Sequence, residues 1–206
     1  MNVQDYFCER DPKAFPRWQQ AIVGIAGAGG LGSNAAIMLA RAGIGELILA
    51  DFDMVSLSNL NRQAFDLSQV GSPKVEALCA NIRRFNPYIR LRSHRIRISA
   101  ENAADIFADA DILIEAFDTA EAKEMLIYAW QKAFPAKPLI CASGISGYGR
   151  SEEIRILAQD SLYVVGDLKS ELETGIAPIA PRVNLVAAMQ ANLCLELLAA
   201  PQRDQT

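Results

Sequence analysis

A short apolar run that ends in a cluster of glycines constrains this chain more than any other feature. Residues 21 to 26 read Ala-Ile-Val-Gly-Ile-Ala, and Gly27-Ala28-Gly29-Gly30-Leu31-Gly32-Ser33 follows directly. An uninterrupted apolar run is typical of a strand buried on both faces of a parallel sheet. Helix-forming residues continue to Ala42, and Gly43 then supplies a stop. The segment therefore predicts a strand, a tight glycine turn and a helix.

The alternation of strand and helix continues along the chain, which favours an α/β fold. Strands are predicted at 47–50, 89–98, 111–117 and 139–142, helices at 73–85, 121–134 and 183–200, and two strands without a helix between them at 153–157 and 162–165. The last two are expected to pair antiparallel. We predict one domain over residues 1–206, built on a doubly wound, mainly parallel, Rossmann-like sheet with some antiparallel strands near the C-terminus.

Two segments are predicted to lie outside this alternation. Residues 1–20 form an N-terminal arm. Residues 166–181 mix Gly166, Gly175, Pro178 and Pro181 with charged residues, which is typical of a long surface loop. We expect this loop to be mobile and to become ordered around a bound partner.

Charge and cysteine usage exclude several classes of protein. The formal charge of −4 and the single histidine argue against a basic surface for nucleic acid. The N-terminus lacks a basic start with an apolar run, and no apolar stretch reaches about 18 residues, so we expect a cytoplasmic protein without a membrane partner. Cys8, Cys79, Cys141 and Cys194 form no CxxC pair, so neither zinc nor a disulfide framework is predicted. Cys8 alone is expected to be exposed, and no covalent thiol catalysis is predicted.

The glycine turn predicts a nucleotide site. Gly27, Gly29, Gly30 and Gly32 permit close approach of the backbone to phosphate, and the following helix offers free N–H groups at its positive end. Asp51, at the tip of the next strand, can accept hydrogen bonds from ribose hydroxyls. These features indicate an adenosine nucleotide and leave both ATP and NAD open.

Spaced motifs resemble the ThiF/MoeB/ubiquitin-activating family. Its members have an aspartate-rich strand end followed by SNLNRQ, a GxxK segment, and an aspartate with a basic residue five positions later. The matching segments here are Asp51-Phe52-Asp53-Met54-Val55-Ser56-Leu57-Ser58-Asn59-Leu60-Asn61-Arg62-Gln63, then Gly71-Ser72-Pro73-Lys74, then Ala116-Phe117-Asp118-Thr119-Ala120-Glu121-Ala122-Lys123. Thr119 and Lys123 replace the more usual asparagine and arginine. The short length makes the chain most similar to compact ThiF variants.

The resemblance implies roles for individual residues. Asp51 is expected on the ribose, with Asp53 beside it in the nucleotide site, and Asn59, Arg62 and Lys74 on the phosphates. Asp118 is expected to hold Mg²⁺, so Arg62, Lys74 and Asp118 are the expected catalytic residues.

Some of these positions have simpler explanations. Asp118 can alternatively be the N-cap of the following helix, and Ser33 and Asn34 either contact phosphate or cap. The reaction that the resemblance implies is adenylation of the C-terminal carboxylate of a carrier protein. It needs no histidine base, because a C-terminal carboxyl has a pKa of about 3.3–3.7 and is already ionised near neutral pH.

The implied activity is ATP-dependent adenylation of the C-terminal carboxylate of a small ubiquitin-like sulfur carrier. A ThiS-like carrier of thiamine thiazole synthesis is the first expectation, and a MoaD-like carrier of molybdopterin synthesis is the nearest variant. The alternatives are an NAD-dependent oxidoreductase, a catalytically silent partner subunit, and a tRNA-modifying relative. The resemblance also implies a homodimer, in which Arg10 or Arg17 reaches the neighbouring site.

The remaining basic and aromatic residues are predicted to be structural. Arg90, Arg92, Arg95 and Arg97 are expected on the solvated face of one strand. Trp18 and Trp130 are expected to be packing residues and not platforms on which bases stack.

Overall fold

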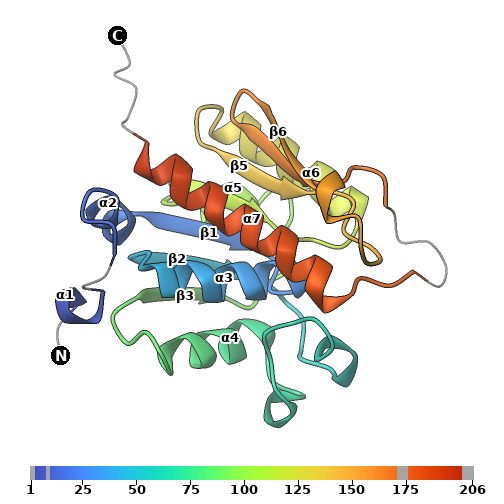
Figure 1. Ribbon diagram of the computed structural model, residues 1–206, viewed down its shortest axis with the longest axis horizontal. Coiled ribbons are helices and arrows are strands. Elements are labelled where there is room, and N and C mark those ends of the chain that lie inside the picture. The colour runs from blue at the N-terminus through green and yellow to red at the C-terminus, as the bar shows by residue number, and fades with distance from the viewer. Residues whose placement is uncertain (1–2, 8–9, 171–175, 201–206) are drawn as a thin grey trace.

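The chain folds around one sheet with helices on both faces. The computed structural model describes residues 3–7, 10–170 and 176–200. Within them the sheet has seven strands in the order β3-β2-β1-β4-β5-β7-β6 (Figure 1). The strands are β1 (Ile22–Ala26), β2 (Glu46–Ala50), β3 (Arg90–His94), β4 (Ile112–Glu115), β5 (Leu139–Ala142), β6 (Arg155–Gln159) and β7 (Leu162–Gly166). Only β6 runs antiparallel to its neighbour, β7, so the predicted mainly parallel sheet with antiparallel strands near the C-terminus is confirmed.

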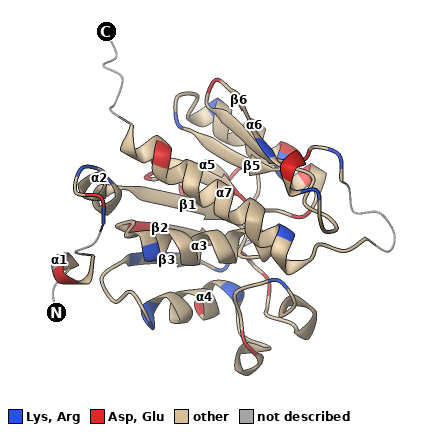
Figure 2. Cartoon of the chain, viewed as in Figure 1, with Lys and Arg blue, Asp and Glu red and all other residues tan. Residues whose placement is uncertain are grey.

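The helices divide between the two faces of the sheet. The longer helices are α3 (Gly30–Ala42), α4 (Lys74–Arg83), α6 (Ala120–Ala133) and α7 (Ala180–Ala199), and the short ones are α1 (Val3–Tyr6), α2 (Phe15–Gln20) and α5 (Ala103–Ile106). One buried cluster joins α3, α4 and α7 to one face, and a second joins α5 and α6 to the other (Figure 1). The ribbons of α3 and α7 carry little charge along their lengths, as the tan colour in Figure 2 shows. This matches their packing against the sheet and each other.

Alternation along each strand explains how both faces are filled. In β1, Val23 and Ile25 belong to the first cluster and Ala26 to the second. Gly24 also faces the second cluster, where an added Cβ would lie 2.8 Å from Phe107 Cδ1. Helix α3 ends at Gly43, whose φ of 105° is the left-handed conformation that a glycine C-cap supplies.

Two predicted boundaries were wrong. The strand predicted over 89–98 ends at His94, so Arg95 and Arg97 lie beyond the sheet. The last helix starts at Ala180, three residues before the predicted start at Val183. Residues 171–175 of the predicted loop 166–181 lie outside the described residues, as does Cys8.

The N-terminal arm packs at the amino end of the parallel strands. Arg10 Nη2 donates to Arg41 O at 2.9 Å, near the end of α3, and Arg17 Nη1 donates to Ala199 O at the end of α7. Trp18 Nε1 donates to Leu195 O at 3.0 Å, so this indole packs against α7 as predicted. None of the described helices is both long and apolar enough to span a membrane.

Candidate functional site

A cavity of about 900 Å³ opens at the carboxyl ends of the parallel strands. The chain leaves β1 toward β2 on one side, and β4 pairs with β1 on the other, so this is the switch point where open α/β sheets bind ligands. Most of the predicted site residues line it: Gly27, Gly29, Gly30, Asp51, Asp53, Arg62, Lys74 and Asp118. Gly32 and Asn59 are not among its lining residues.

The glycine turn brings backbone to the cavity wall. Gly27 has φ of 100°, and its N–H donates to Ala50 O at 2.9 Å. Gly32 allows the first turn of α3 to pack, because an added Cβ would lie 1.9 Å from Gly27 O. At Gly29, by contrast, the nearest atom to an added Cβ is 4.0 Å away. Gly32 therefore serves packing, whereas Gly29 leaves open space at the N-terminus of α3, where anions bind favourably.

Asp51 fixes this turn from the neighbouring strand. One carboxylate oxygen accepts from Ala28 N at 2.6 Å and the other accepts from Asp53 N at 2.7 Å. A carboxylate has about four lone-pair sites, so both oxygens retain acceptor capacity. Asp51 can therefore hold the turn and still accept from ribose hydroxyls.

Two cations stand beside the turn. Lys74 is buried, with Nζ 2.7 Å from Asp53 Oδ2, so the two predicted residues form an ion pair in the cavity wall. Arg62 is half-buried and donates through Nη1 to Ser58 O at 3.2 Å and to Asn61 Oδ1 at 2.9 Å. These two cations and the N-terminus of α3 therefore lie on one side of the cavity, together with the carboxylates of Asp51 and Asp53.

Asn59 has a local structural role. Its Oδ1 accepts from Ser56 N at 3.0 Å, in a capping box around the short 3₁₀-helix Leu57–Asn59. Its Nδ2 makes no bond with a described residue and remains a donor, although Asn59 does not line the cavity.

Ser33 and Asn34 tie the first turn of α3 to the segment that carries Arg62. Ser33 Oγ donates to Gly29 O at 2.6 Å and accepts from Ala64 N at 3.1 Å. Asn34 Nδ2 donates to Gly30 O at 2.7 Å and to Arg62 O at 2.9 Å. Neither side chain caps α3, which has no side-chain cap.

Asp118 stands on the opposite side of the cavity, after β4. The alternative that it caps α6 was wrong, because the N-cap is Thr119, whose Oγ1 accepts from Ala122 N at 3.3 Å. The Asp118 side chain is exposed and has no hydrogen bond or ion pair with any described residue. Its charge is therefore available to a ligand.

Glu115 and Lys123, close to Asp118 in the sequence, form a buried ion pair that was not predicted. Glu115 is fully buried, and Lys123 Nζ lies 2.8 Å from its Oε1 and 2.9 Å from its Oε2. Glu115 Oε1 also accepts from Phe117 N at 2.6 Å. Burial raises the pKa of Glu115, and the Lys123 ammonium opposes that rise. Glu115 is an acidic residue within the apolar run 112–117, and this is the sequence feature that could have indicated a buried ion pair.

Asp167 and Arg182 form a second buried ion pair that was not predicted from the sequence. Arg182 Nη2 lies 2.6 Å from Asp167 Oδ2, both side chains are almost fully buried, and Arg182 Nη1 donates to Gly149 O at 2.6 Å. Asp167 Oδ1 accepts from the N–H of Lys169 and of Ser170, each at 2.8 Å. This pair fixes the start of α7 against the segments that follow β5 and β7.

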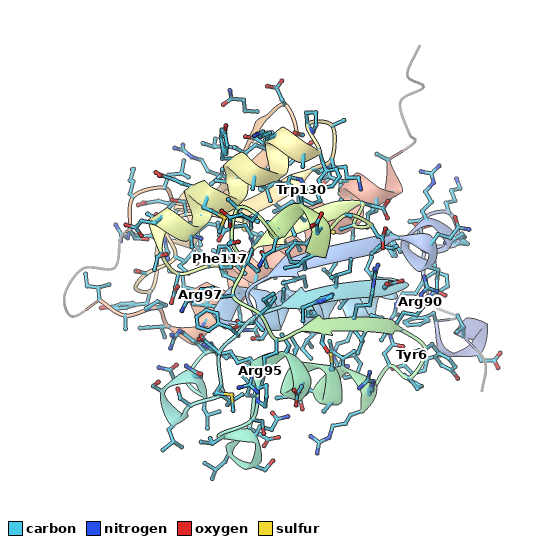
Figure 3. All side chains as sticks on the ribbon, turned by 180° about the vertical axis from the view of Figure 1, so that it is seen from behind. Tyr6, Arg90, Arg95, Arg97, Phe117 and Trp130 are labelled. Carbon is cyan, nitrogen blue, oxygen red and sulfur yellow. The ribbon has the colours of Figure 1, made fainter. Side chains whose placement is uncertain are left out.

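Aromatic and apolar groups line the remaining part of the cavity. Phe52, Ile96 and Ile98 contribute side chains there, and the Arg97 guanidinium lies 3.9 Å from the centre of the Phe52 ring. Figure 3 shows Arg97 and Phe117 at this end of the sheet and Arg90 at the other.

The expectation of one solvated arginine face was wrong. Arg90 pairs with Glu46 at 2.8 Å, Arg92 pairs with Asp109 at 2.7 Å, and Arg97 borders the cavity. Arg92 and Arg95 are three residues apart, so a regular strand would place them on opposite faces, and the chain in any case leaves the strand after His94.

The described cysteines are buried, as predicted for Cys141 and Cys194. Burial raises the pKa of the Cys79, Cys141 and Cys194 thiols, which keeps them protonated near neutral pH. Trp130 is fully buried in the second cluster, so its predicted packing role is also confirmed. Over residues 3–7, 10–170 and 176–200, no group of three or more His, Cys, Asp or Glu side chains is placed to hold a metal ion.

Comparison with known proteins supplies the family. The model of the ThiF family matches residues 9–206. The chain is 36% identical over 133 residues to the adenylyltransferase and sulfurtransferase UBA4 of Kluyveromyces lactis. This match covers 64% of this chain and 30% of that protein. It is also 42% identical over 95 residues to the ubiquitin-like modifier-activating enzyme 5 of Drosophila virilis. This second match covers 46% of this chain and 24% of that protein. The chain thus spans less than a third of these relatives' lengths.

The fold is also shared with a solved structure. The E. coli tRNA N6-threonylcarbamoyladenosine dehydratase TcdA, in complex with ATP, superposes with a TM-score of 0.83 at 22% identity. The match covers 95% of this chain and 91% of that chain. At this identity the likeness shows the fold alone.

Proposed function

The chain belongs to the ThiF family, and we propose that it is an adenylyltransferase that joins the C-terminal carboxylate of a small ubiquitin-like carrier to the α-phosphate of ATP. One observation carries the proposal. One cavity is lined by Arg62 and Lys74, which follow β2, by the N-terminus of α3, and by Asp118, which follows β4 and has no partner among the described residues. That arrangement suits a triphosphate with an associated cation.

The proposed reaction needs positioning and charge stabilisation more than proton transfer. A carboxylate oxygen of the carrier attacks the α-phosphorus, the bond from that phosphorus to the bridging oxygen breaks, and pyrophosphate leaves with the bond electrons. Because the carboxylate is already ionised near neutral pH, no base is required. Arg62, Lys74 and the backbone N–H groups at the start of α3 neutralise the phosphates, and Asp51 orients the ribose.

Magnesium fits this residue set when it is bound through the nucleotide. Mg²⁺ keeps several waters and is commonly held by one or two carboxylates plus substrate phosphates. Asp118 is exposed and unpaired within the described part of the chain, whereas Asp53 is already paired with Lys74. Bound Mg²⁺ would supply further neutralisation of phosphate charge, and we assign Asp118 to hold it.

The names of the relatives support the substrate class. One is an adenylyltransferase and sulfurtransferase, and the other activates a ubiquitin-like modifier. Among such carriers we propose a ThiS-like protein, with a MoaD-like protein as the second candidate. Comparing kcat/KM for pyrophosphate exchange with each carrier decides between them, and a higher value with the MoaD-like carrier would reverse our order.

We also propose that the chain acts as one ThiF domain, in the cytoplasm, as a homodimer. Arg10 and Arg17 each donate to a carbonyl of their own chain, at the amino end of the sheet. A role for either in a neighbouring site would require these bonds to open. Sedimentation of the purified chain tests the dimer.

ATP with Mg²⁺ is expected to raise the melting temperature more than NAD or NADP does. A ligand that binds only the folded state adds about 2.7 kcal/mol at a concentration of a hundred times its Kd, which corresponds to several degrees for a chain of this size. Thermal unfolding with each nucleotide at equal concentration measures this. Stabilisation by NAD with none by ATP would favour the oxidoreductase alternative instead.

A further inference from the structure

The side chain of Gln63 is buried at the cavity wall without a hydrogen-bonding partner. It is 9% exposed and lines the cavity together with Gly29, Gly30 and Arg62. Its Oε1 is buried and unpaired, and its Nε2 also bonds to no described residue. Buried side-chain amides almost always have partners, so this one needs an explanation.

The position of the Gln63 amide points to a ligand of the glycine turn. A Cβ added to Gly29 would lie 4.0 Å from Nε2, which is the nearest heavy atom to that point. Nε2 therefore stands beside the open backbone of the turn, where a phosphate would be received. An amide nitrogen there offers two neutral N–H donors next to the Arg62 cation.

The surrounding structure holds Gln63 firmly. Its own N–H donates to Asn59 O at 2.9 Å, and its carbonyl accepts from Phe65 N at 2.9 Å. Ser33 Oγ accepts from Ala64 N, and Asn34 Nδ2 donates to Arg62 O, so both neighbours of Gln63 are tied to α3. The backbone that carries Gln63 is thus fixed relative to the turn, although the side-chain amide makes no bond that would stabilise the fold.

An unpaired buried acceptor destabilises the folded protein, and an apolar side chain of similar size would avoid that loss. Proteins retain groups that lower the stability of the fold mainly at functional sites. The buried Oε1 is explained if the amide is required for its other atom, Nε2, at the cavity surface.

We propose that Gln63 is a nucleotide-contacting residue whose Nε2 donates a hydrogen bond to the phosphate chain of the bound nucleotide. The proposal rests on ATP being the ligand of this cavity. The Gln63 amide would add a neutral donor to the cations Arg62 and Lys74. Because this donor is in position before the nucleotide binds, it can stabilise the charge that develops on the phosphates.

Gln63→Met tests this with two readouts that should move in opposite directions. Removing the unpaired amide is expected to raise the melting temperature of the ligand-free chain by about 2–4 °C. The Kd for ATP with Mg²⁺, measured by calorimetry, is expected to rise roughly tenfold or more, as for loss of a hydrogen bond to a charged group.

Gln69 offers a matched control. Its Nε2 donates to Asn81 Oδ1 at 2.8 Å and to Ala77 O at 3.3 Å, and it does not line the cavity. Gln69→Met should therefore lower the melting temperature and leave the Kd for ATP unchanged.

The side-chain amide signals of wild-type Gln63 in a ¹⁵N spectrum give a second measurement that requires no variant. They should shift on addition of ATP with Mg²⁺, while those of Gln69 stay in place. If wild-type chain binds ATP but Gln63→Met binds it equally well, the inference about Gln63 is wrong and the proposed function stands. A wild-type chain that binds no ATP would overturn both.

Discussion

Asp118→Asn is expected to reduce carrier-dependent pyrophosphate exchange by about a hundredfold or more, as for loss of a main electrostatic contributor. The substitution keeps the shape of the side chain and removes the charge that would hold Mg²⁺ against the departing pyrophosphate. Folding should be unaffected, because Asp118 is exposed, bonds to no described residue and leaves the helix cap to Thr119. ATP binding should weaken and remain measurable.

Asp111→Asn is the matched control for that variant. Asp111 stands just before β4, at the opposite end of the strand from Asp118, and its Oδ2 accepts from Ile22 N at 2.8 Å. An amide oxygen can accept the same bond, so exchange should stay near the wild-type rate. Wild-type exchange in a stably folded Asp118→Asn chain would remove Asp118 from the mechanism.

Gly32→Ala is expected to destabilise the fold by about 3 kcal/mol or more, at the upper end of the usual effect of overpacking. The new methyl would lie 1.9 Å from Gly27 O and 3.1 Å from Ala116 Cβ. The first atom is backbone, so the turn or the start of α3 must shift. Urea unfolding, followed by circular dichroism, measures the loss.

Gly29→Ala separates packing from ligand approach within the same turn. Gly29 has φ of −80°, and an added Cβ has no heavy atom closer than 4.0 Å, so the substitution should cost less than about 1 kcal/mol, mostly from a poorer N-cap. The methyl would project where a phosphate is received, and ATP affinity should fall. Equal stability losses in the two variants would show that both glycines serve packing alone.

Local pattern was enough to predict most of the fold. Apolar runs marked β1, β2, β4 and β5, because strands buried on both faces are mostly apolar, although β2 and β4 each also contain one buried glutamate, Glu46 and Glu115. Alternating residues between 89 and 98 marked β3 and overestimated its length. That pattern cannot show where a chain leaves its neighbouring strand, which here happens after His94.

The candidate site was predicted only as far as its residues lie in local motifs. Asp51, Arg62, Lys74 and Asp118 follow strand ends or occupy spaced motifs, and the fold brings them to one cavity. The same motif also named Asn59, whose Oδ1 makes a local capping bond and which does not line the cavity.

Long-range partners were not visible in the sequence. The Asp167–Arg182 pair joins residues from different elements, and only the folded chain shows that both are buried. Gln63 stood inside a recognised motif, yet its missing hydrogen bonds become apparent only when every neighbour is in place.

Incorporation of labelled pyrophosphate into ATP, with and without a ubiquitin-like carrier that ends in Gly-Gly, tests adenylation most directly. We expect exchange that requires both Mg²⁺ and the carrier, and that is lost when the terminal carboxylate of the carrier is amidated, because that carboxylate is the nucleophile. Exchange that persists with the amidated carrier would contradict this chemistry, as would a chain that binds ATP and catalyses no exchange with any such carrier.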